Sequence, residues 1–404
     1  MLFCRKVNRM TKTNQKIPVG WSVKKLGEIG TFVSGGTPDT EKPEYWNGDI
    51  VWLTPSEITK LKTRFVSDSE RKITKLGLKN SSAVLLPKNS LIICTRATVG
   101  DCCINTKEVS TNQGFKNLIP NNNCVDFLYY LISIHKNDLI RRACGSTFLE
   151  ISKHDIEKLK YVFPPLAEQE KIAEILSCWD EGIEKLSALI EKKKLQKKAL
   201  MQKLLTAKIR LPGFTDPWKN VKLGDFLIFQ TGFPFDSQFF NQDGNGIRLI
   251  KNRDLKSDDQ MYFYSGNYST DDIVNDGDIL VGMDGDFLPC LWKKGRALLN
   301  QRVGRVICKK NLNHIFAYYA LSSPLEKIQN KTASTTVKHL SHAGVLEIKT
   351  IIPSSLAEQK AIADILSKAD AEIELLNKKL AAFNLEKKAM MQKLLTGQIR
   401  VKVN

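Results

Sequence analysis

A few residue patterns in this 404-residue chain have types and spacings that could support catalysis. Asp39, followed much later by Glu70 and Lys72, has the order of the carboxylate pair and lysine that surround a nuclease metal ion. His339 and His342 are three residues apart, but the sequence around them offers no third metal ligand. The wide gap in the first pattern and the missing ligand in the second favour ordinary surface residues at both places.

Other enzyme classes lack their defining motifs. The acidic run between Asp271 and Asp286 does not have the regular spacing of a calcium-binding loop, so turn residues beside strands are favoured. No GxxxxGK[ST] loop is present, so ATP hydrolysis is not expected. The Pro-Pro pair after Phe163 lacks the flanking acid or amide and the aromatic residue of an amino-methyltransferase. We therefore expect no catalytic residue, no metal site and no cofactor in this chain.

The composition favours a polyanionic partner. Lys and Arg total 61 against 43 for Asp and Glu, a net charge of +18, which nucleic-acid-binding proteins share with ribosomal and membrane-surface proteins. No run reaches the roughly 18 apolar residues of a membrane helix, and the basic N-terminus has no apolar core, so we expect a cytoplasmic protein. Nine cysteines without a CxxC pair favour reduced thiols over disulfides or a zinc site.

An internal repeat organises the elements that must position any functional residue. The segment from Leu166 to Arg210 matches the segment from Leu356 to Arg400 at an offset of 190 residues, with about 25 of 45 residues identical. In both segments apolar residues alternate steps of four and three over several heptads, which is typical of a coiled-coil helix. The predicted seam consists of Ile172, Leu176, Trp179, Ile183, Leu186, Ile190, Leu200 and Leu204 in the first helix and Ile362, Leu366, Ile373, Leu376, Leu380, Phe383, Met390 and Leu394 in the second.

The charges along the two helices predict how they pair. Acidic residues gather in the N-terminal half of each helix and basic residues in the C-terminal half, which suits the helix dipole. Only antiparallel pairing sets opposite charges against each other. The seam then places Ile172 opposite Leu394 and Trp179 opposite Lys387, where we expect a cation–π contact.

The segments before the two helices also repeat, more faintly. Short β-rich runs broken by Gly, Asn and Pro predict mixed α/β structure there. The expected fold class is α+β or mixed: two α/β domains separated by two long antiparallel coiled-coil helices with pseudo-two-fold symmetry. The expected segments are 1–163 (first domain), 164–210 (first helix), 211–352 (second domain) and 353–404 (second helix).

Short sequence motifs typical of a known family occur along these segments. PPLAEQ and PSSLAEQ precede the two helices, and QKLLT ends both. SGGTP, TPSEI and TNQGF occur in the first domain, and RLPGF follows the first helix. In these phrases and in their order, the chain resembles the specificity (S) subunits of type I restriction-modification systems over nearly its whole length. It departs at Thr231, where TGFPF replaces SGGTP, and in the first ten residues, which look like an extension before a start at Met10.

The resemblance implies that each α/β domain is a target-recognition domain reading one half of a bipartite, asymmetric DNA site through the major groove. The helices would serve as a spacer and as the docking surface for two methyltransferase (M) subunits, which bind S-adenosylmethionine and methylate adenine. Restriction (R) subunits would join this core and use ATP and Mg. The chain itself would be a non-catalytic subunit that directs methylation or restriction.

Candidate DNA contacts come from aligning the two domains. Arg96, after SLIICT, occupies the place of Asp284, after DILVGM. Arg commonly donates two hydrogen bonds to guanine, and a carboxylate accepts from the amine of cytosine or adenine, so the pair predicts unlike half-sites unless both are turn residues. The complete set of candidates is Thr95, Arg96, Asn112, Gln113, Lys116, Lys251, Arg253, Asp284, Asn300, Gln301 and Arg302.

The sequence leaves several alternatives open. The repeated Asn–Gln pairs could satisfy buried backbone groups instead of reading bases, and the glycines of SGGTP could approach a phosphate or form a turn. The chain could also be a self-contained nuclease or methylase with a duplicated reader, or a repressor-like protein that binds DNA alone. An activity assay of the purified chain tests the first of these functions, and binding with and without M subunits tests the second.

Overall fold

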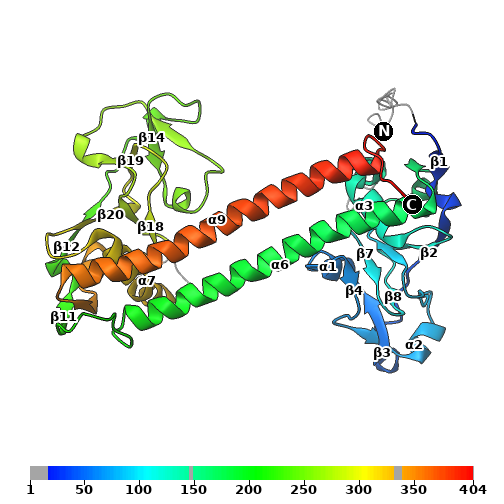
Figure 1. The fold of residues 1–404 in the computed structure, drawn as a ribbon, viewed down its shortest axis with the longest axis horizontal. Helices are drawn as coiled ribbons and strands as arrows, with labels where there is room; N and C mark the ends of the chain where they lie inside the picture. Colours follow the sequence, from blue (N-terminus) through cyan, green and yellow to red (C-terminus); the bar gives the residue numbers. More distant parts are fainter. Residues whose placement is uncertain (1–16, 145–148, 332–338, 404) are drawn as a thin grey trace. The chain divides into compact units, whose positions relative to one another are not determined.

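The computed structural model describes residues 17–144, 149–331 and 339–403, with the elements labelled in Figure 1. The proposed start at Met10 lies outside these residues. Mixed α/β units and two long helices confirm the predicted fold class. Across the described part of the chain, no helix is long and apolar enough to cross a membrane, and all eight cysteines are unpaired thiols.

The chain forms two compact units, each of which includes segments that are distant in the sequence. The long helices are α6 (Leu166–Leu204) and α9 (Leu356–Leu395). The first unit contains the chain up to Leu186 and again from Lys379 onward, whereas the second runs from Ser187 to Lys378. Each unit therefore combines one α/β domain with a part of each long helix.

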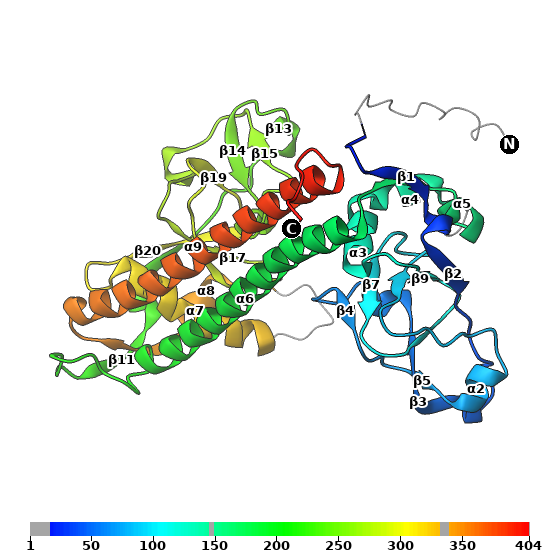
Figure 2. The same cartoon turned by 45° about the vertical axis from the view of Figure 1, so that its right-hand side comes forward.

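The first unit is built on a five-stranded sheet of order β2-β9-β6-β7-β4, with α3 against β7 (Figure 2). A three-stranded sheet, β5-β3-β8, and the pair β1-β10 complete it. Its strands are β1 Ser22–Lys25, β2 Gly30–Ser34, β3 Trp46–Leu53, β4 Phe65–Val66, β5 Lys72–Ile73, β6 Leu91–Ile93, β7 Cys102–Asn105, β8 Ser110–Thr111, β9 Lys116–Pro120 and β10 Lys160–Phe163. Its short helices are α1 Pro55–Ile58, α2 Lys75–Lys79, α3 Val125–Ile134, α4 Lys136–Arg142 and α5 Lys153–Glu157.

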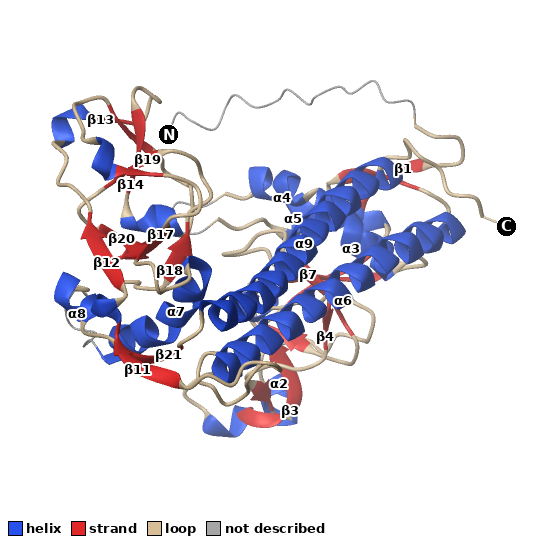
Figure 3. Cartoon of the chain, turned by 60° about the vertical axis from the view of Figure 1, so that its left-hand side comes forward, coloured by secondary structure: helices blue, strands red, loops and turns tan. Residues whose placement is uncertain are grey.

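The second unit repeats this plan with a four-stranded sheet of order β12-β20-β17-β18, and α7 lies against β18 (Figure 3). A five-stranded sheet, β13-β15-β14-β19-β16, and the pair β11-β21 complete it. Its strands are β11 Trp218–Lys222, β12 Leu227–Thr231, β13 Phe240–Asn241, β14 Ile247–Ile250, β15 Tyr262–Tyr264, β16 Ile273–Val274, β17 Ile279–Gly282, β18 Pro289–Leu291, β19 Ala297–Leu299, β20 Val303–Cys308 and β21 Lys349–Pro353. Its short helices are α7 His314–Lys331 and α8 His342–Leu346.

The long helices are buried most deeply where an α/β domain covers them. Ile172 and Leu394 lie in the core of the first unit, and Leu204 and Ile362 lie in the core of the second. The buried members of the predicted seam are Ile172, Leu176, Leu186, Ile190, Leu204, Ile362, Leu366 and Leu394. The half-buried members are Trp179, Ile183, Ile373, Leu376, Leu380, Phe383 and Met390. The prediction was wrong for Leu200, whose 37% exposure places it outside the seam, while the neighbouring Met201 packs against the core.

The helix segments within each unit run antiparallel, as the charges predict. In the first unit Asp180 of α6 forms an ion pair with Lys387 of α9, and in the second Lys197 of α6 forms one with Asp370 of α9. One detail was wrong, because Trp179 packs edge-on against Phe383 rather than against Lys387. The ammonium of Lys387 turns towards Asp180 and lies 5.3 Å from the ring centre of Tyr130.

A buried carboxylate at the start of each long helix holds three separate chain segments together. The Glu168 carboxylate is 3% to 4% exposed and accepts two hydrogen bonds from the Arg400 guanidinium, at 2.6 and 2.8 Å. It also accepts one from the indole of Trp21, at 2.9 Å. Because Trp21 precedes β1 and Arg400 follows α9, this one side chain joins both ends of the described chain to α6.

The same arrangement recurs at the start of α9. The buried Glu358 accepts two hydrogen bonds from Arg210, at 2.7 and 2.9 Å, and one from the indole of Trp218, at 3.1 Å. The α6 helix ends at Leu204, before the expected limit at residue 210, because the following turn carries Arg210 to Glu358. We call each Glu–Arg–Trp group a clasp: Glu168–Arg400–Trp21 in the first unit and Glu358–Arg210–Trp218 in the second.

The glutamine beside each clasp ties its helix to the α/β domain. Gln169 accepts a hydrogen bond from the Cys124 amide at 3.1 Å and donates one to the Pro164 carbonyl at 3.0 Å. Gln359 accepts from the Asn313 amide at 2.7 Å and donates to the Pro353 carbonyl at 3.0 Å. The repeated Glu–Gln of each helix entry is therefore explained by the fold, because both side chains satisfy buried polar groups.

Each long helix ends in a left-handed turn. Gly397 and its counterpart Ala207 have φ of 72° and 57°. In both turns the amide two residues later bonds back to the last helical turn, Ile399 to the Lys393 carbonyl at 3.1 Å and Ile209 to the Lys203 carbonyl at 3.2 Å. A side chain at such a position is strained, and glycine removes the strain.

Exchanging the residues of these two turns should therefore have opposite effects. Ala207→Gly should raise the free energy of unfolding by about 0.5–1 kcal/mol, because the αL strain exceeds the extra freedom of the unfolded glycine. Gly397→Ala should lower it by roughly 1–3 kcal/mol, since its methyl group would also collide with Pro18. Urea unfolding of the full chain measures both values, and a lower midpoint for Ala207→Gly would contradict this account.

The first clasp predicts that a residue of α6 stabilises both ends of the described chain. Glu168→Gln should cost roughly 1.5–3 kcal/mol of unfolding free energy, since it removes the charge that the Arg400 guanidinium binds. Hydrogen exchange should accelerate around Trp21 and after Leu395. Glu170→Gln, at an exposed position of the same turn, is the matched control and should leave both quantities unchanged. Equal exchange rates in the two variants would contradict a stabilising role for the clasp.

Candidate nucleic-acid interface

Arg96 and Asp284 have equivalent places in their units. Arg96 comes shortly after β6, and its backbone forms an antiparallel bridge with Glu150. Asp284 comes shortly after β17, and its backbone forms the same kind of bridge with His339. The alignment that set Arg96 against Asp284 therefore matches their structural surroundings.

Each of the two residues is paired with a side chain of complementary character. Arg96 donates from Nε and Nη2 to one oxygen of Glu150, at 3.1 and 2.6 Å. Asp284 lies 2.9 Å from Nδ1 of His339 and 3.4 Å from Nε of Arg302. Both members of the Arg96–Glu150 pair stay partly exposed, with side-chain exposures of 44% and 34%. The first unit thus presents a guanidinium with a bound carboxylate, and the second presents a carboxylate flanked by two donors.

The structure brings most of the second-unit candidates together in a shallow pocket of about 430 Å³. Its lining consists of Lys251, Asn252, Arg253, Tyr262, Asp284, Asn300 and Arg302. Gln301 is exposed but does not line this pocket, and its amide donates to the Phe233 carbonyl at 3.0 Å. Five of the six predicted residues therefore share one surface.

Tyr262 orders the basic residues of this pocket. The Lys251 ammonium lies 3.2 Å from the centre of its ring, and the Arg253 guanidinium lies 5.3 Å from it. Partial burial lowers the pKa of Lys251. Cations held against an aromatic ring are fixed in position but keep donors for an anionic ligand. The arrangement can bind a phosphate or a base edge beside the Asp284 carboxylate.

The first-unit candidates differ in what they expose. Thr95 was wrong as a base contact, because its side chain is fully buried and donates to the Gly114 carbonyl at 3.1 Å. Lys116 is half-buried, and this burial lowers its pKa. The positive charge of Arg96 also lowers the pKa of Lys116, whereas the negative charge of Glu150 raises it. The charges of Arg96 and Glu150 thus act on Lys116, which remains a candidate contact.

The repeated Asn–Gln pairs mainly shape turns. Asn112 accepts from the Gly114 amide at 2.9 Å, and Asn300 accepts from the Gln301 amide at 2.7 Å. Gln113 accepts from the Thr37 hydroxyl at 2.5 Å. These bonds support the alternative in which the asparagines satisfy backbone groups, while the exposed Gln113 and Gln301 keep donors that can reach outward.

The glycines of SGGTP and TGFPF permit close packing. A side chain on Gly35 would collide with the Asn112 carbonyl, and one on Gly232 would collide with the Asn300 carbonyl. The Gly36 amide donates to the Thr111 carbonyl at 2.9 Å, and the Gly232 amide donates to the Val303 carbonyl at 3.0 Å. Because the Gly36 and Gly232 amides are bonded within the chain, these bonds support the turn interpretation.

Sequence reasoning missed Glu150 and His339, the partners of Arg96 and Asp284. A signal for them exists, because each stands two residues before a serine that caps a short helix, Ser152 or Ser341. This match has an offset of 189 residues instead of the 190 of the long helices. An alignment that allowed one inserted residue before α9 would have paired them.

The metal-like patterns of the sequence do not form metal sites in the described residues. Within these residues no three His, Cys, Asp or Glu side chains are placed to hold one ion. Glu70 pairs with Lys60, and Lys72 pairs with Asp68, so their partners are not those of a nuclease centre. His339 binds Asp284, and the ring of His342 lies 6.0 Å from that of Phe229.

Known proteins share both the sequence pattern and the fold. The family model described as "Type I restriction modification DNA specificity domain" matches residues 18–195 and again 215–384. The chain belongs to this family. Each match contains one α/β domain and much of the long helix that follows it, so the family model recognises the same duplication as the internal repeat.

Individual specificity subunits are similar to this chain, some over nearly its whole length and others over part of it. The MjaIX specificity subunit of Methanocaldococcus jannaschii is 27% identical over 427 residues, covering 96% of this chain and 95% of that protein. The EcoBI specificity subunit of Escherichia coli is 36% identical over 160 residues, covering 39% of this chain and 34% of that protein. The type I restriction-modification S subunit from M. genitalium shares the fold, with a TM-score of 0.59, 17% identity and coverage of 95% and 98%. A structure described under complex assembly and conformational transition of the type I R-M system gives a TM-score of 0.61 at 18% identity, covering 95% of this chain and 100% of that one.

Proposed function

We propose that this chain is the DNA-specificity subunit of a type I restriction-modification enzyme, recognising a bipartite asymmetric site. The observation that carries the proposal is the match of the specificity-domain model to both halves of the chain, with Arg96 and Asp284 in equivalent places. Two copies of one frame with opposite charges suit the reading of two different half-sites. The net charge of +18 suits a DNA partner.

In this function the two surfaces read different base edges. The Arg96–Glu150 pair offers donors and an acceptor side by side, so Arg96 binds guanine while Glu150 holds its orientation. Asp284, held by His339 and Arg302, accepts a hydrogen bond from the amine of cytosine or adenine. Lys251 and Arg253 bind the neighbouring phosphates and set the register of the second unit on the duplex.

The chemistry of methylation and cleavage is assigned to partner subunits. The chain carries neither an amino-methyltransferase loop nor a phosphate-binding loop, so two M subunits supply S-adenosylmethionine and methylate adenine. R subunits join through the M subunits and supply the ATP- and Mg-dependent activity. The complex acts on DNA in the cytoplasm. This chain determines which DNA sequence is bound and holds no cofactor of its own.

The first test asks whether recognition and catalysis are separate. The purified chain, alone and with its M subunit, is incubated with S-adenosylmethionine and unmodified genomic DNA, and methylated adenines are mapped. We expect no methylation by the chain alone and methylation of one bipartite motif by the complex. Methylation or cleavage by the chain alone would instead identify a self-contained enzyme. Binding of that motif equally well without the M subunit would identify a repressor-like protein.

Exchanging one reader tests whether the half-sites are independent. Residues 26–159 are replaced by the matching segment of another family member, which leaves the Glu168–Arg400–Trp21 clasp in place. We expect one half of the methylated motif to change and the other half to stay. A change in both halves would show that the two units do not read separately.

Replacing Arg96 tests direct reading. Arg96→Ala should relax base choice at one position of one half-site, at a cost of roughly 1–3 kcal/mol in discrimination. Arg141→Ala removes an arginine that is 78% exposed and paired only loosely with Asp138, at 3.7 Å, and it should leave sequence preference unaltered. Competition binding against single-base variants of the motif measures both proteins. Unchanged preference in Arg96→Ala would remove Arg96 from the reading surface.

A further inference from the structure

The main sheets of the two units differ by one strand. Leu91 of β6 faces Ile104 of β7, and Ile279 of β17 faces Leu291 of β18, so β18 is the counterpart of β7. In the first unit β4 continues the sheet beyond β7. In the second unit β18 is the last strand that the described residues provide.

In the first unit the additional strand brings an arginine with it. The Ile104 amide donates to the Arg64 carbonyl at 2.8 Å, and the Thr106 amide donates to the Val66 carbonyl at 2.9 Å. The Arg64 guanidinium donates to Asp126 at 2.8 Å and to the Ser177 hydroxyl at 2.9 Å. It also lies 3.5 Å from Asp180. The strand and its arginine thus join the sheet edge to α6.

The second unit keeps the receiving side chains of this arrangement. Tyr319, Ser367 and Asp370 are the counterparts of the residues that surround Arg64 in the first unit. Asp370 accepts from Lys197 at 2.5 Å and from the Tyr319 hydroxyl at 2.7 Å. In the first unit, Asp180 accepts from a lysine and a tyrosine in the same way and additionally faces Arg64.

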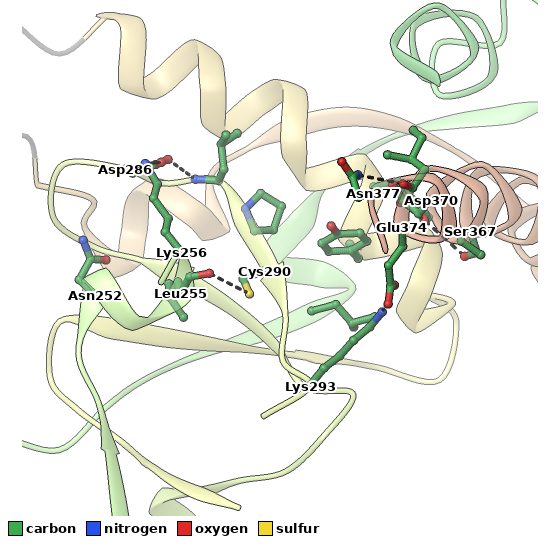
Figure 4. A pocket seen from close by; sticks show the side chains of 17 residues that line it. Asn252, Leu255, Lys256, Asp286, Cys290, Lys293, Ser367, Asp370, Glu374 and Asn377 are labelled. Carbon is green, nitrogen blue, oxygen red and sulfur yellow. Dashed lines mark hydrogen bonds and ion pairs between the residues drawn. The ribbon is translucent and has the colours of Figure 1, made fainter. Parts of the chain in front are cut away.

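A pocket of about 660 Å³ lies where the strand and its arginine would be (Figure 4). Asp370 and Glu374 project from α9 on one side, and β18 with Cys290 forms the other. None of the described residues that line it is an arginine. Of its two lysines, Lys256 forms an ion pair with Asp286, and Lys293 lies 3.7 Å from Glu374.

The pocket lining suits the two parts of an arginine side chain. The acidic side is provided by Asp370 and Glu374, and the remaining wall includes Leu291, Ile373 and the 47%-exposed Leu288. Arginine packs its stem on apolar groups and donates from a planar fork to carboxylates. A volume of about 660 Å³ exceeds that of one guanidinium, so it accommodates neighbouring residues of the same segment.

We propose that this pocket and the edge of β18 bind an extended, arginine-bearing segment of a partner protein, which completes the sheet as a parallel fifth strand. A main-chain carbonyl of the segment accepts a hydrogen bond from the Leu291 amide, as the Arg64 carbonyl does from the Ile104 amide in the first unit. Adding a strand to an exposed sheet edge is an established mode of peptide recognition. The segment's guanidinium donates to Ser367 and Asp370. Glu374 accepts a further hydrogen bond from it, as Asp126 does from Arg64 in the first unit. The identification of the partner as the M subunit rests on the proposed function.

Filling the pocket tests this docking site in the complex. Ala371 lines the pocket, and Ala371→Trp should weaken binding of the M subunit to the full chain at least tenfold. The matched control is Glu181→Trp, at the same place in the first repeat, where β4 already occupies the sheet edge. It should bind within twofold of wild type. Equal affinities for the two variants, measured by calorimetry, would overturn the proposal.

A peptide probe tests the pocket without any partner subunit. The probe is a synthetic peptide of residues 60–69, which contains the β4 strand with its arginine, and the control peptide carries citrulline at that arginine. Fluorescence anisotropy should show saturable binding of the first peptide to the full chain, at least tenfold weaker binding of the second, and loss of binding to Ala371→Trp. Equal binding of both peptides, or binding of neither, would overturn the proposal. If the peptide binds as expected but the M subunit does not bind the wild-type chain, the proposed function fails while the arginine-binding pocket stands.

Discussion

The buried carboxylate at the start of each long helix is the interaction on which the rest of the structure depends. Glu168 and Glu358 are almost completely removed from solvent, and a buried charge without partners would cost several kcal/mol. An arginine that follows the opposite long helix and a tryptophan that precedes the first strand of the unit satisfy this charge together. The requirement to neutralise one carboxylate thus fixes which helix ends meet, which strand begins the domain, and where the chain turns.

The two units share what holds them together and differ where a ligand would bind. The clasps, the glutamines beside them and the Tyr–Asp–Lys contacts recur residue for residue. The positions of Arg96 and Asp284 keep the same backbone bridge but reverse their charge, and among the described residues the edge strand with Arg64 occurs in one unit only. Duplication has therefore preserved the frame and left the exposed corners free to acquire different chemistry.

The arrangement of two domains and two long helices was predictable because the sequence contains long segments with a regular apolar periodicity and an internal repeat. The seven-residue periodicity and the charge gradient predicted two antiparallel helices, and an ungapped repeat predicted two related domains. The site was predictable only in part. Periodicity did not reveal that Thr95 points inward, nor that Glu150 and His339, more than 50 residues downstream, pair with Arg96 and Asp284. Such bridges lie outside regular strands, so no local pattern marks them. The unit boundaries inside α6 and α9 likewise depend on packing with distant segments.

The division of the first unit between two distant parts of the chain has a consequence for biosynthesis. Its core includes Leu394 and Leu395, and its clasp includes Arg400, all of which follow the complete second unit in the sequence. During translation the second unit is complete first, although the α/β domain of the first unit leaves the ribosome earlier. The first unit can complete its core only after the end of α9 has been synthesised. The entropic cost of bringing such distant segments together grows only logarithmically with the intervening length, but these contacts form slowly and leave apolar surface exposed in the meantime. Premature termination within the last turns of α9 therefore leaves the N-terminal domain incomplete and exposes it to chaperones and proteases.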